Sequence, residues 1–197
     1  DKTIIKNSAS APALVTEDDD GQGYGNIGDS GATTPTQIQI SNMTIRTTVA
    51  YGGLSIDNAT KVFVNNVKFQ GTYVSGGSDA STSKGVTVRS TTALPCANIV
   101  FDQCQFTGFA RLVDLSFDVT TMRFINCDFT TAYYGALIGA EMDGSTNGLT
   151  KGPRDVQFTG SSWSTIGQQA ILVAPATGAD SGTGPRNIIS YGNFYAE

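Results

Sequence analysis

The residues of this chain best suited to chemistry are three carboxylates in its second half. Asp114 lies in the segment RLVDLSF, and Glu141 and Asp143 lie further along in GAEMDGS. Two carboxylates held about 5 to 10 Å apart can cleave a glycosidic bond, one as acid and the other as base or nucleophile. We therefore regard Asp114, with Glu141 or Asp143, as candidate catalytic residues. The alternative is that all three are solvated surface groups.

Two adjacent aromatic residues could bind a sugar. Tyr133 and Tyr134 occur together in TTAYYGALIG. A tyrosine ring offers a flat apolar face with a polar tip, which suits the face of a pyranose ring. We expect at least one of the two rings to be exposed, as a candidate binding residue. The alternative is that both rings pack at a corner of the fold.

The residues that other common catalytic and metal-binding sites require are missing from the sequence or poorly spaced. The chain contains no His, which removes the Ser-His-Asp and Cys-His routes to nucleophilic catalysis. Its three cysteines show no CxxC spacing, so no zinc site is expected. The one dense acidic run, TEDDDGQG with Glu17 to Asp20, has carboxylates suited to calcium but no basic partner nearby, and we interpret it as a solvated loop. We expect no metal and no cofactor.

Charge and hydropathy exclude two classes of partner. The net charge is −5 and the sequence pI about 4.6, so no broad basic surface for nucleic acid is expected. No apolar run approaches the roughly 18 residues that a membrane-spanning helix needs. We therefore expect neither nucleic-acid binding nor membrane insertion.

The elements that must position these residues follow from an internal repeat. The phrases NIVFDQCQFTG and TMRFINCDFTT share one order of apolar and polar residues at a distance of about 23 residues. Related copies are QIQISNMTI, KVFVNNVKFQG, DVQFTGSSWST and NIISYGNFY. Short alternating apolar runs separated by Gly, Asn and Thr favour strands over helices. The repeat predicts an all-β fold, a right-handed parallel β-helix of about six to seven rungs.

The bend inside each copy supports this fold. Asn42, Asn66, Gln103 and Asn126 occupy equivalent positions, followed by Gly160. Asn tolerates left-handed backbone angles, and stacked amides can bond each other from rung to rung. We expect these amides to form a buried ladder. A glycosylation sequon at Asn42 would then be inaccessible, whereas a second sequon begins at Asn58.

Alternation along the strands predicts the core. Residues expected to point inward are Ile99, Phe101, Cys104, Phe106, Phe129 and Trp163. Cys104 and Cys127 share one inward column on neighbouring rungs, either as two stacked small side chains or as a disulfide. If Val113, Leu115 and Phe117 also point inward, Asp114 points outward, with Glu141 about one rung further along the same side.

The opening DKTIIKN, the phrase NIVFDQCQFTG and these columns resemble the pectin-lyase-like superfamily of right-handed parallel β-helices. The resemblance extends over residues 1–197 and implies one domain, with a leading rung and loop over 1–36 and regular rungs over 37–197. Loop insertions are expected near 72–84, 140–154 and 174–186. The superfamily includes polysaccharide lyases, polygalacturonases and bacteriophage tailspikes. The calcium cluster of such lyases and the His of polygalacturonases find no counterpart here.

The favoured expectation is a structural, receptor-binding segment of a virion appendage, located on a virion or outside the cell. Its partners would be other virion subunits, a homotrimer being implied by the resemblance, and a cell-surface polysaccharide. Both ends interrupt an apolar alternation, so we expect a segment of a longer chain. Two alternatives stay open: a polysaccharide hydrolase or lyase, and a bacterial surface adhesin.

Overall fold

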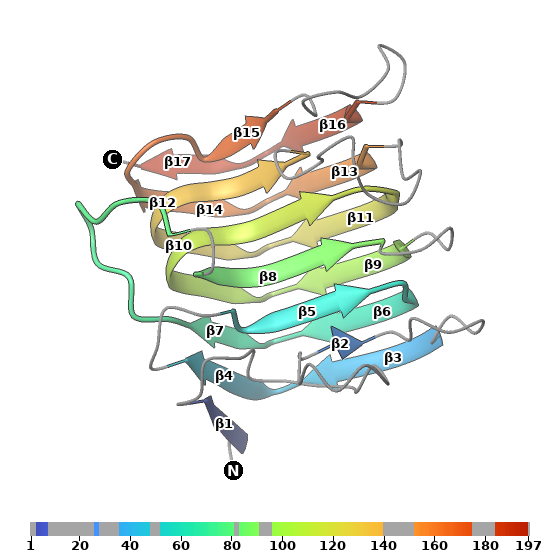
Figure 1. The fold of residues 1–197 in the computed structure, drawn as a ribbon, viewed down its shortest axis with the longest axis horizontal. Helices are drawn as coiled ribbons and strands as arrows, with labels where there is room; N and C mark the ends of the chain where they lie inside the picture. The colour runs from blue at the N-terminus through green and yellow to red at the C-terminus, as the bar shows by residue number, and fades with distance from the viewer. Residues whose placement is uncertain are drawn as a thin grey trace.

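The computed structural model describes residues 3–7, 26–27, 36–47, 52–80, 83–90, 96–139, 152–174 and 184–196. These residues form strands joined by bends and links, and none of them lies in a helix. The strands form two sheets in which every pair of neighbours is parallel. Successive strands of the chain alternate between the sheets (Figure 1), which makes the fold a parallel β-solenoid of about six rungs.

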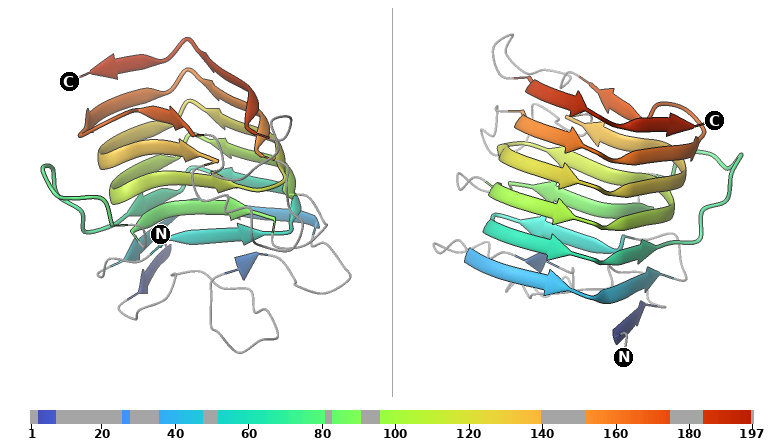
Figure 2. Two further views of the ribbon diagram at one scale, coloured as in Figure 1. Left: turned by 45° about the horizontal axis from the view of Figure 1, so that its top comes forward. Right: turned by 180° about the vertical axis from the view of Figure 1, so that it is seen from behind.

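The first sheet has six strands in chain order along the solenoid axis. Its members are β3 (Thr36–Ser41), β6 (Thr60–Asn65), β9 (Cys96–Asp102), β11 (Val119–Ile125), β13 (Arg154–Thr159) and β16 (Arg186–Tyr191). Figure 2 shows this sheet from behind, with each strand lying over the next.

The second sheet has 11 strands in two rows. One row contains β1 (Thr3–Asn7), β4 (Met43–Thr47), β7 (Lys68–Gln70), β14 (Ser162–Ile166) and β17 (Phe194–Ala196). The other row contains β2 (Asn26–Ile27), β5 (Leu54–Asp57), β8 (Lys84–Arg89) and β15 (Ile171–Val173). The long strands β10 (Gln105–Ser116) and β12 (Asp128–Ile138) belong to both rows. A complete rung therefore passes once through the first sheet and through both rows of the second.

Aromatic rings stacked along the axis fill the core. One column runs through Phe69, Phe106, Phe129 and Trp163 with ring centroids 4.9, 4.8 and 4.0 Å apart. A second column, on the first sheet, contains Phe101, Phe124 and Phe158, spaced 5.1 and 4.7 Å apart. The parallel register places like residues above one another, so each ring stacks on its equivalent in the next rung.

The predicted inward residues are buried. Ile99, Phe101, Cys104, Phe106 and Trp163 are all 0 or 1% exposed, which confirms the alternation read from the sequence. The prediction is wrong for one residue. Phe117 was expected to point inward, but it is partly exposed and lies outside the core. It follows β10 with a φ of 58°, where the chain turns toward β11.

The amide column is confirmed in position but not in burial. The bend residues Asn42, Asn66, Gln103 and Asn126 lie in successive rungs with φ between 51° and 57°, and Gly160 continues the column at 61°. Each backbone N–H donates to a carbonyl of the next rung, as from Asn66 to Asp102 at 3.0 Å. The side chains are exposed, so the expectation of a buried ladder was wrong. Of the two sequons, it is Asn58 that is buried, at 1% exposure.

The cysteines are free thiols. Cys96, Cys104 and Cys127 are all buried, and Cys104 and Cys127 stack on neighbouring rungs without a disulfide. The pKa of the Cys127 thiol is raised well above its ordinary value, mainly by a hydrogen bond with Cys104 and secondly by burial. Burial raises the pKa of Cys96 to about 12. Both shifts indicate packing groups rather than reactive nucleophiles.

Residues 71–83 join β7 to β8, and the described part of this link projects from one side of the solenoid (Figure 1, green). The insertion expected near 72–84 falls here. The insertions expected near 140–154 and 174–186 lie largely outside the described residues, and so does most of 1–36.

Candidate functional site

The predicted carboxylate Asp114 lies in the second half of β10, beside three other charged residues. We call Asp79, Lys84, Arg111 and Asp114 the charged cluster. Arg111 Nη1 donates to Asp114 Oδ2 at 3.1 Å, and Lys84 Nζ lies 3.1 Å from the same oxygen. The Asp114 side chain is 0% exposed. Asp114 alternates with the core residues Val113 and Leu115, as predicted for a residue that points out of the core, yet it is closed to solvent.

Arg111 ties the link between β7 and β8 to the sheet. Its Nε and Nη2 donate to the two carboxylate oxygens of Asp79 at 3.0 and 2.8 Å, a bidentate pair. Backbone groups add to this attachment, since the Arg111 N–H donates to the carbonyl of Ser83 at 2.9 Å. Burial by itself would lower the pKa of Arg111, but the hydrogen bonds and charges of Asp79 and Asp114 outweigh it and raise that pKa. Arg111 therefore stays a cation that holds two carboxylates.

The second predicted member of the catalytic pair is not brought to Asp114 within the described residues. Glu141 and Asp143 lie outside them. The residue that pairs with Asp114 on the next rung is Leu137, in β12. The pairing of Asp114 with Glu141 or Asp143, and a catalytic role for these carboxylates, therefore stay predictions.

The two predicted tyrosines lie next to the charged cluster. Tyr134 is in register with Arg111 on the neighbouring strand, and Tyr133 contacts Tyr134 edge to face with ring centroids 4.8 Å apart. Both side chains are partly exposed. The sequence predicted Asp114 and the tyrosine pair as separate candidate sites. In the structure they are neighbours, because Arg111 binds Asp114 and is in register with Tyr134.

A third ring, Tyr73, was missed by the sequence analysis. Its hydroxyl donates to the carbonyl of Gly77 at 2.8 Å within the link 71–83. Burial is the main cause that raises the pKa of Tyr73, and the nearby Tyr133 and Asp79 raise this pKa further. The Tyr73 N–H donates to the carbonyl of Gly108 in β10 at 2.7 Å, and β10 pairs with β12, the strand of the two tyrosines. Tyr73 therefore lies by the same face, which we call the tyrosine face: Tyr73, Tyr133 and Tyr134. The sequence alone does not show this, since Tyr73 lies far from the pair in the chain.

The carboxylate of Asp114 is not presented to solvent on this face. Asp114 is held by two cations and closed to solvent, so it is not placed to exchange a proton with a substrate. Among the described residues, no group of three or more Cys, Asp or Glu is placed to hold a metal ion. What the face offers to solvent is three partly exposed rings beside a bidentate Arg–Asp pair.

Comparison of the chain with protein-family models, with curated proteins and with solved structures gives no match. In the part of the chain that the structure describes, no helix is long and apolar enough to cross a membrane.

Proposed function

We propose that the chain is a structural β-solenoid of an extracellular or virion appendage, and that it binds a surface glycan through the tyrosine face. The carrying observation is the position of three partly exposed rings beside the charged cluster, whose members Arg111 and Asp114 are buried. A scaffold of stacked rungs suits this role because Tyr133 and Tyr134 lie on a strand, β12, rather than on a free loop. The resemblance to pectin-lyase-like tailspikes supports the same assignment, and with it a homotrimer and contacts to other virion subunits.

Rigid aromatic side chains favour glycan binding for an energetic reason. The Tyr133 and Tyr134 rings have few rotatable bonds, and their mutual contact restricts them before any ligand arrives. Arg111 and Asp79 fasten the link that carries Tyr73 to β10, the strand that pairs with β12 beside Tyr134. Little freedom is lost when a sugar packs on such a face.

The test is a glycan-binding panel on the intact chain, read for binding and for cleavage in the same samples. Binding to one polysaccharide should weaken about fivefold in Tyr133→Ala and Tyr134→Ala, because a stacked ring contributes about 1 kcal/mol. Tyr191→Ala, which removes a tyrosine that is 74% exposed on β16, should bind normally. Equal binding by all three variants would refute the tyrosine face.

The same samples separate binding from catalysis. New reducing ends or unsaturated products, lost in Asp114→Asn, would identify a hydrolase or lyase and overturn the structural assignment. Sedimentation of the chain at micromolar concentration tests the homotrimer.

A further inference from the structure

The first sheet, β3-β6-β9-β11-β13-β16, turns an open outer face to solvent. Seen from behind, its strands lie side by side, and no other described strand lies in front of them (Figure 2). Outward residues alternate with inward core residues, so they form columns from rung to rung. The central column contains Gln39, Phe63, Val100, Arg123, Gln157 and Ile189. Phe63 and Ile189 are large apolar residues with 39% and 41% exposure. We call this surface, formed by the outward residues of the six strands, the outer sheet face.

Between the starts and the ends of its strands, the outer sheet face carries two cations and two anions. The cations are Lys61 on β6 and Arg123 on β11, which are exposed and make no hydrogen bond or ion pair with any described residue. The anions are Asp102 at the end of β9, which accepts a hydrogen bond from Asn65 at 3.1 Å, and Asp155 on β13. The face therefore has no net charge at these positions, and its cations are available to a partner.

The four charges are arranged antisymmetrically about the line between β9 and β11. In sheet order, Lys61 lies on the second strand, Asp102 on the third, Arg123 on the fourth and Asp155 on the fifth. A half-turn about an axis in the face, parallel to β9 and β11 and midway between them, exchanges the second strand with the fifth and the third with the fourth. This operation places a second copy of the face against the first, so each cation meets a strand that carries an anion.

The positions along the strands match as well as the strand order. Lys61 and Asp155 lie in one column, so each faces the other directly in the second copy. Arg123 faces Val100 of the second copy, and Asp102 lies two residues further along that strand. The apolar stem of the arginine can cover the valine while its guanidinium group reaches the carboxylate. Packed sheets lie about 10 Å apart, a distance that a long cationic side chain and an aspartate bridge together.

Charge repulsion argues against the other twofold arrangement of the same face. An axis along the solenoid would pack every strand on the same strand of the second copy, and Arg123 would then face Arg123. In the first arrangement the two arginines at the strand starts, Arg154 and Arg186, face Thr60 and Thr36 instead. The charge pattern therefore favours two solenoids that run in opposite directions.

The size of the face determines the strength of the contact. Six strands at about 4.8 Å spacing, each roughly 20 Å long, bury about 1,000 Å² in total when two copies meet, at the lower limit of specific interfaces. We propose that two copies of the chain associate through the outer sheet face as a weak antiparallel dimer, held by Lys61–Asp155 and Arg123–Asp102 pairs. This dimer leaves the tyrosine face open and does not depend on the function proposed above.

The first test is sedimentation equilibrium of the intact chain over a concentration series that reaches hundreds of micromolar, in low salt. The mass should approach twice that of the single chain, and added salt should reverse the association, because partly exposed ion pairs are screened. The same measurement separates this dimer from the homotrimer. A single-chain mass at every concentration, or a mass of three chains, would overturn the proposal.

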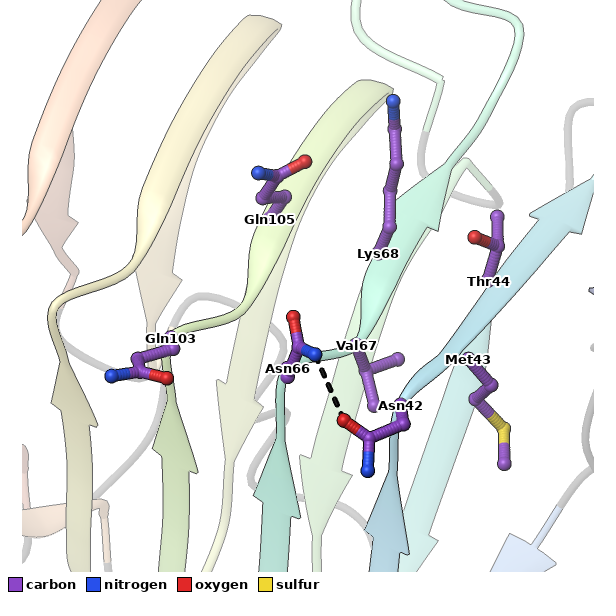
Figure 3. A pocket seen from close by; sticks show the side chains of 8 residues that line it. All are labelled: Asn42, Met43, Thr44, Asn66, Val67, Lys68, Gln103 and Gln105. Atoms are coloured by element: carbon purple, nitrogen blue, oxygen red, sulfur yellow. Dashed lines mark hydrogen bonds between the residues drawn. The ribbon is translucent and has the colours of Figure 1, made fainter. Parts of the chain in front are cut away.

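Charge reversal tests the pairing itself. Lys61→Asp places like charges together at two symmetry-related positions and should weaken association roughly tenfold, and Asp155→Lys should do the same. An equimolar mixture of the two variants should associate as strongly as the unchanged chain, because each variant supplies the charge that the other lacks. The matched control is Lys68→Asp. The Lys68 side chain stands out from β7 on the second sheet (Figure 3), so its reversal should leave association unchanged.

The thermal midpoint of each variant verifies folding. If the mixture associates no better than the single variants, Lys61 does not meet Asp155 of a second copy. If Lys68→Asp weakens association as much as Lys61→Asp, the effect is one of net charge rather than of this face. Either result would overturn the proposal.

Discussion

The two halves of strand β10 carry polar side chains in opposite states. In the first half, the side chain of Gln105 is exposed, with an amide that bonds to no described residue. In the second half, Arg111 and Asp114 are buried and bonded to each other and to Asp79 and Lys84. Both halves lie on the same sheet and pair with the same strand, β12.

The link 71–83 bonds to both halves, but in different ways. The Gly71 and Tyr73 N–H groups donate to backbone carbonyls of the first half, whereas the Asp79 carboxylate accepts two hydrogen bonds from the Arg111 side chain of the second half. A charge that loses its water must be compensated by a partner, so the polar residues of this half bind one another. The exposed amide of the first half keeps its water. The same strand therefore carries solvated polar groups in one half and mutually bonded ones in the other.

The largest expected effect comes from breaking the charged cluster. Arg111→Met removes one cation from the buried Asp114 and releases Asp79, and it should lower the free energy of unfolding by about 3 kcal/mol. Lys68→Met on β7, beside the first half of β10, should change it by less than about 0.5 kcal/mol, because Lys68 binds no described residue. Urea unfolding followed by the fluorescence of Trp163, the single tryptophan, measures both. Equal losses in the two variants would show that the two halves do not differ in this way.

A smaller effect should separate the backbone role of the bend amides from their side-chain role. Asn66 has a φ of 51°, and its amide bonds to Asn42. Asn66→Ala keeps a Cβ at a left-handed position, whereas Asn66→Gly removes it, and both lose the amide bond. The alanine variant should be less stable than the glycine variant by about 1 kcal/mol in urea unfolding. If both lose the same amount, the ladder bond rather than the backbone angle explains the amide at this bend.

The fold was predictable because residues that stack in successive rungs recur at equivalent positions of the sequence repeat. A bend that needs a left-handed residue recruits Asn or Gly, so Asn66, Asn126 and Gly160 align in the sequence as they do in space. The ring columns were predictable for the same reason, since Phe101 and Phe124 occur at the same place in neighbouring copies.

The candidate site was less predictable because it depends on contacts between segments that share no repeat. Alternation places Asp114 on the outer side of β10, but only the link 71–83 brings Asp79 to Arg111. Leu137 is the residue of β12 in register with Asp114, and the repeat does not specify how the chain continues after β12.

A second left-handed column escaped the sequence analysis because its residues have no common type. It crosses the first sheet just before each inward apolar residue, with φ between 52° and 62°, at Gln37, Lys61, Asn98, Thr121, Asp155 and Asn187. Only two of the six are Asn. A left-handed angle is unfavourable for a residue with a Cβ, and most unfavourable for a β-branched one. The register of the sheet therefore imposes this angle where the local sequence does not favour it.

The smallest predicted effect is a gain in stability at that column. Thr121 is its β-branched member, with a φ of 54°, and Thr121→Asn should raise the free energy of unfolding by about 0.5 kcal/mol, because Asn tolerates this angle. The matched control is Thr107→Asn in the first half of β10, where φ is not positive. That variant should lose a few tenths of a kcal/mol, because Asn is a poorer strand residue than Thr. Urea unfolding of the two single variants and the double variant decides the matter, since the sites are far apart and their effects should add. A loss at both positions would mean that the left-handed column is set by side-chain contacts on the outer face rather than by the backbone.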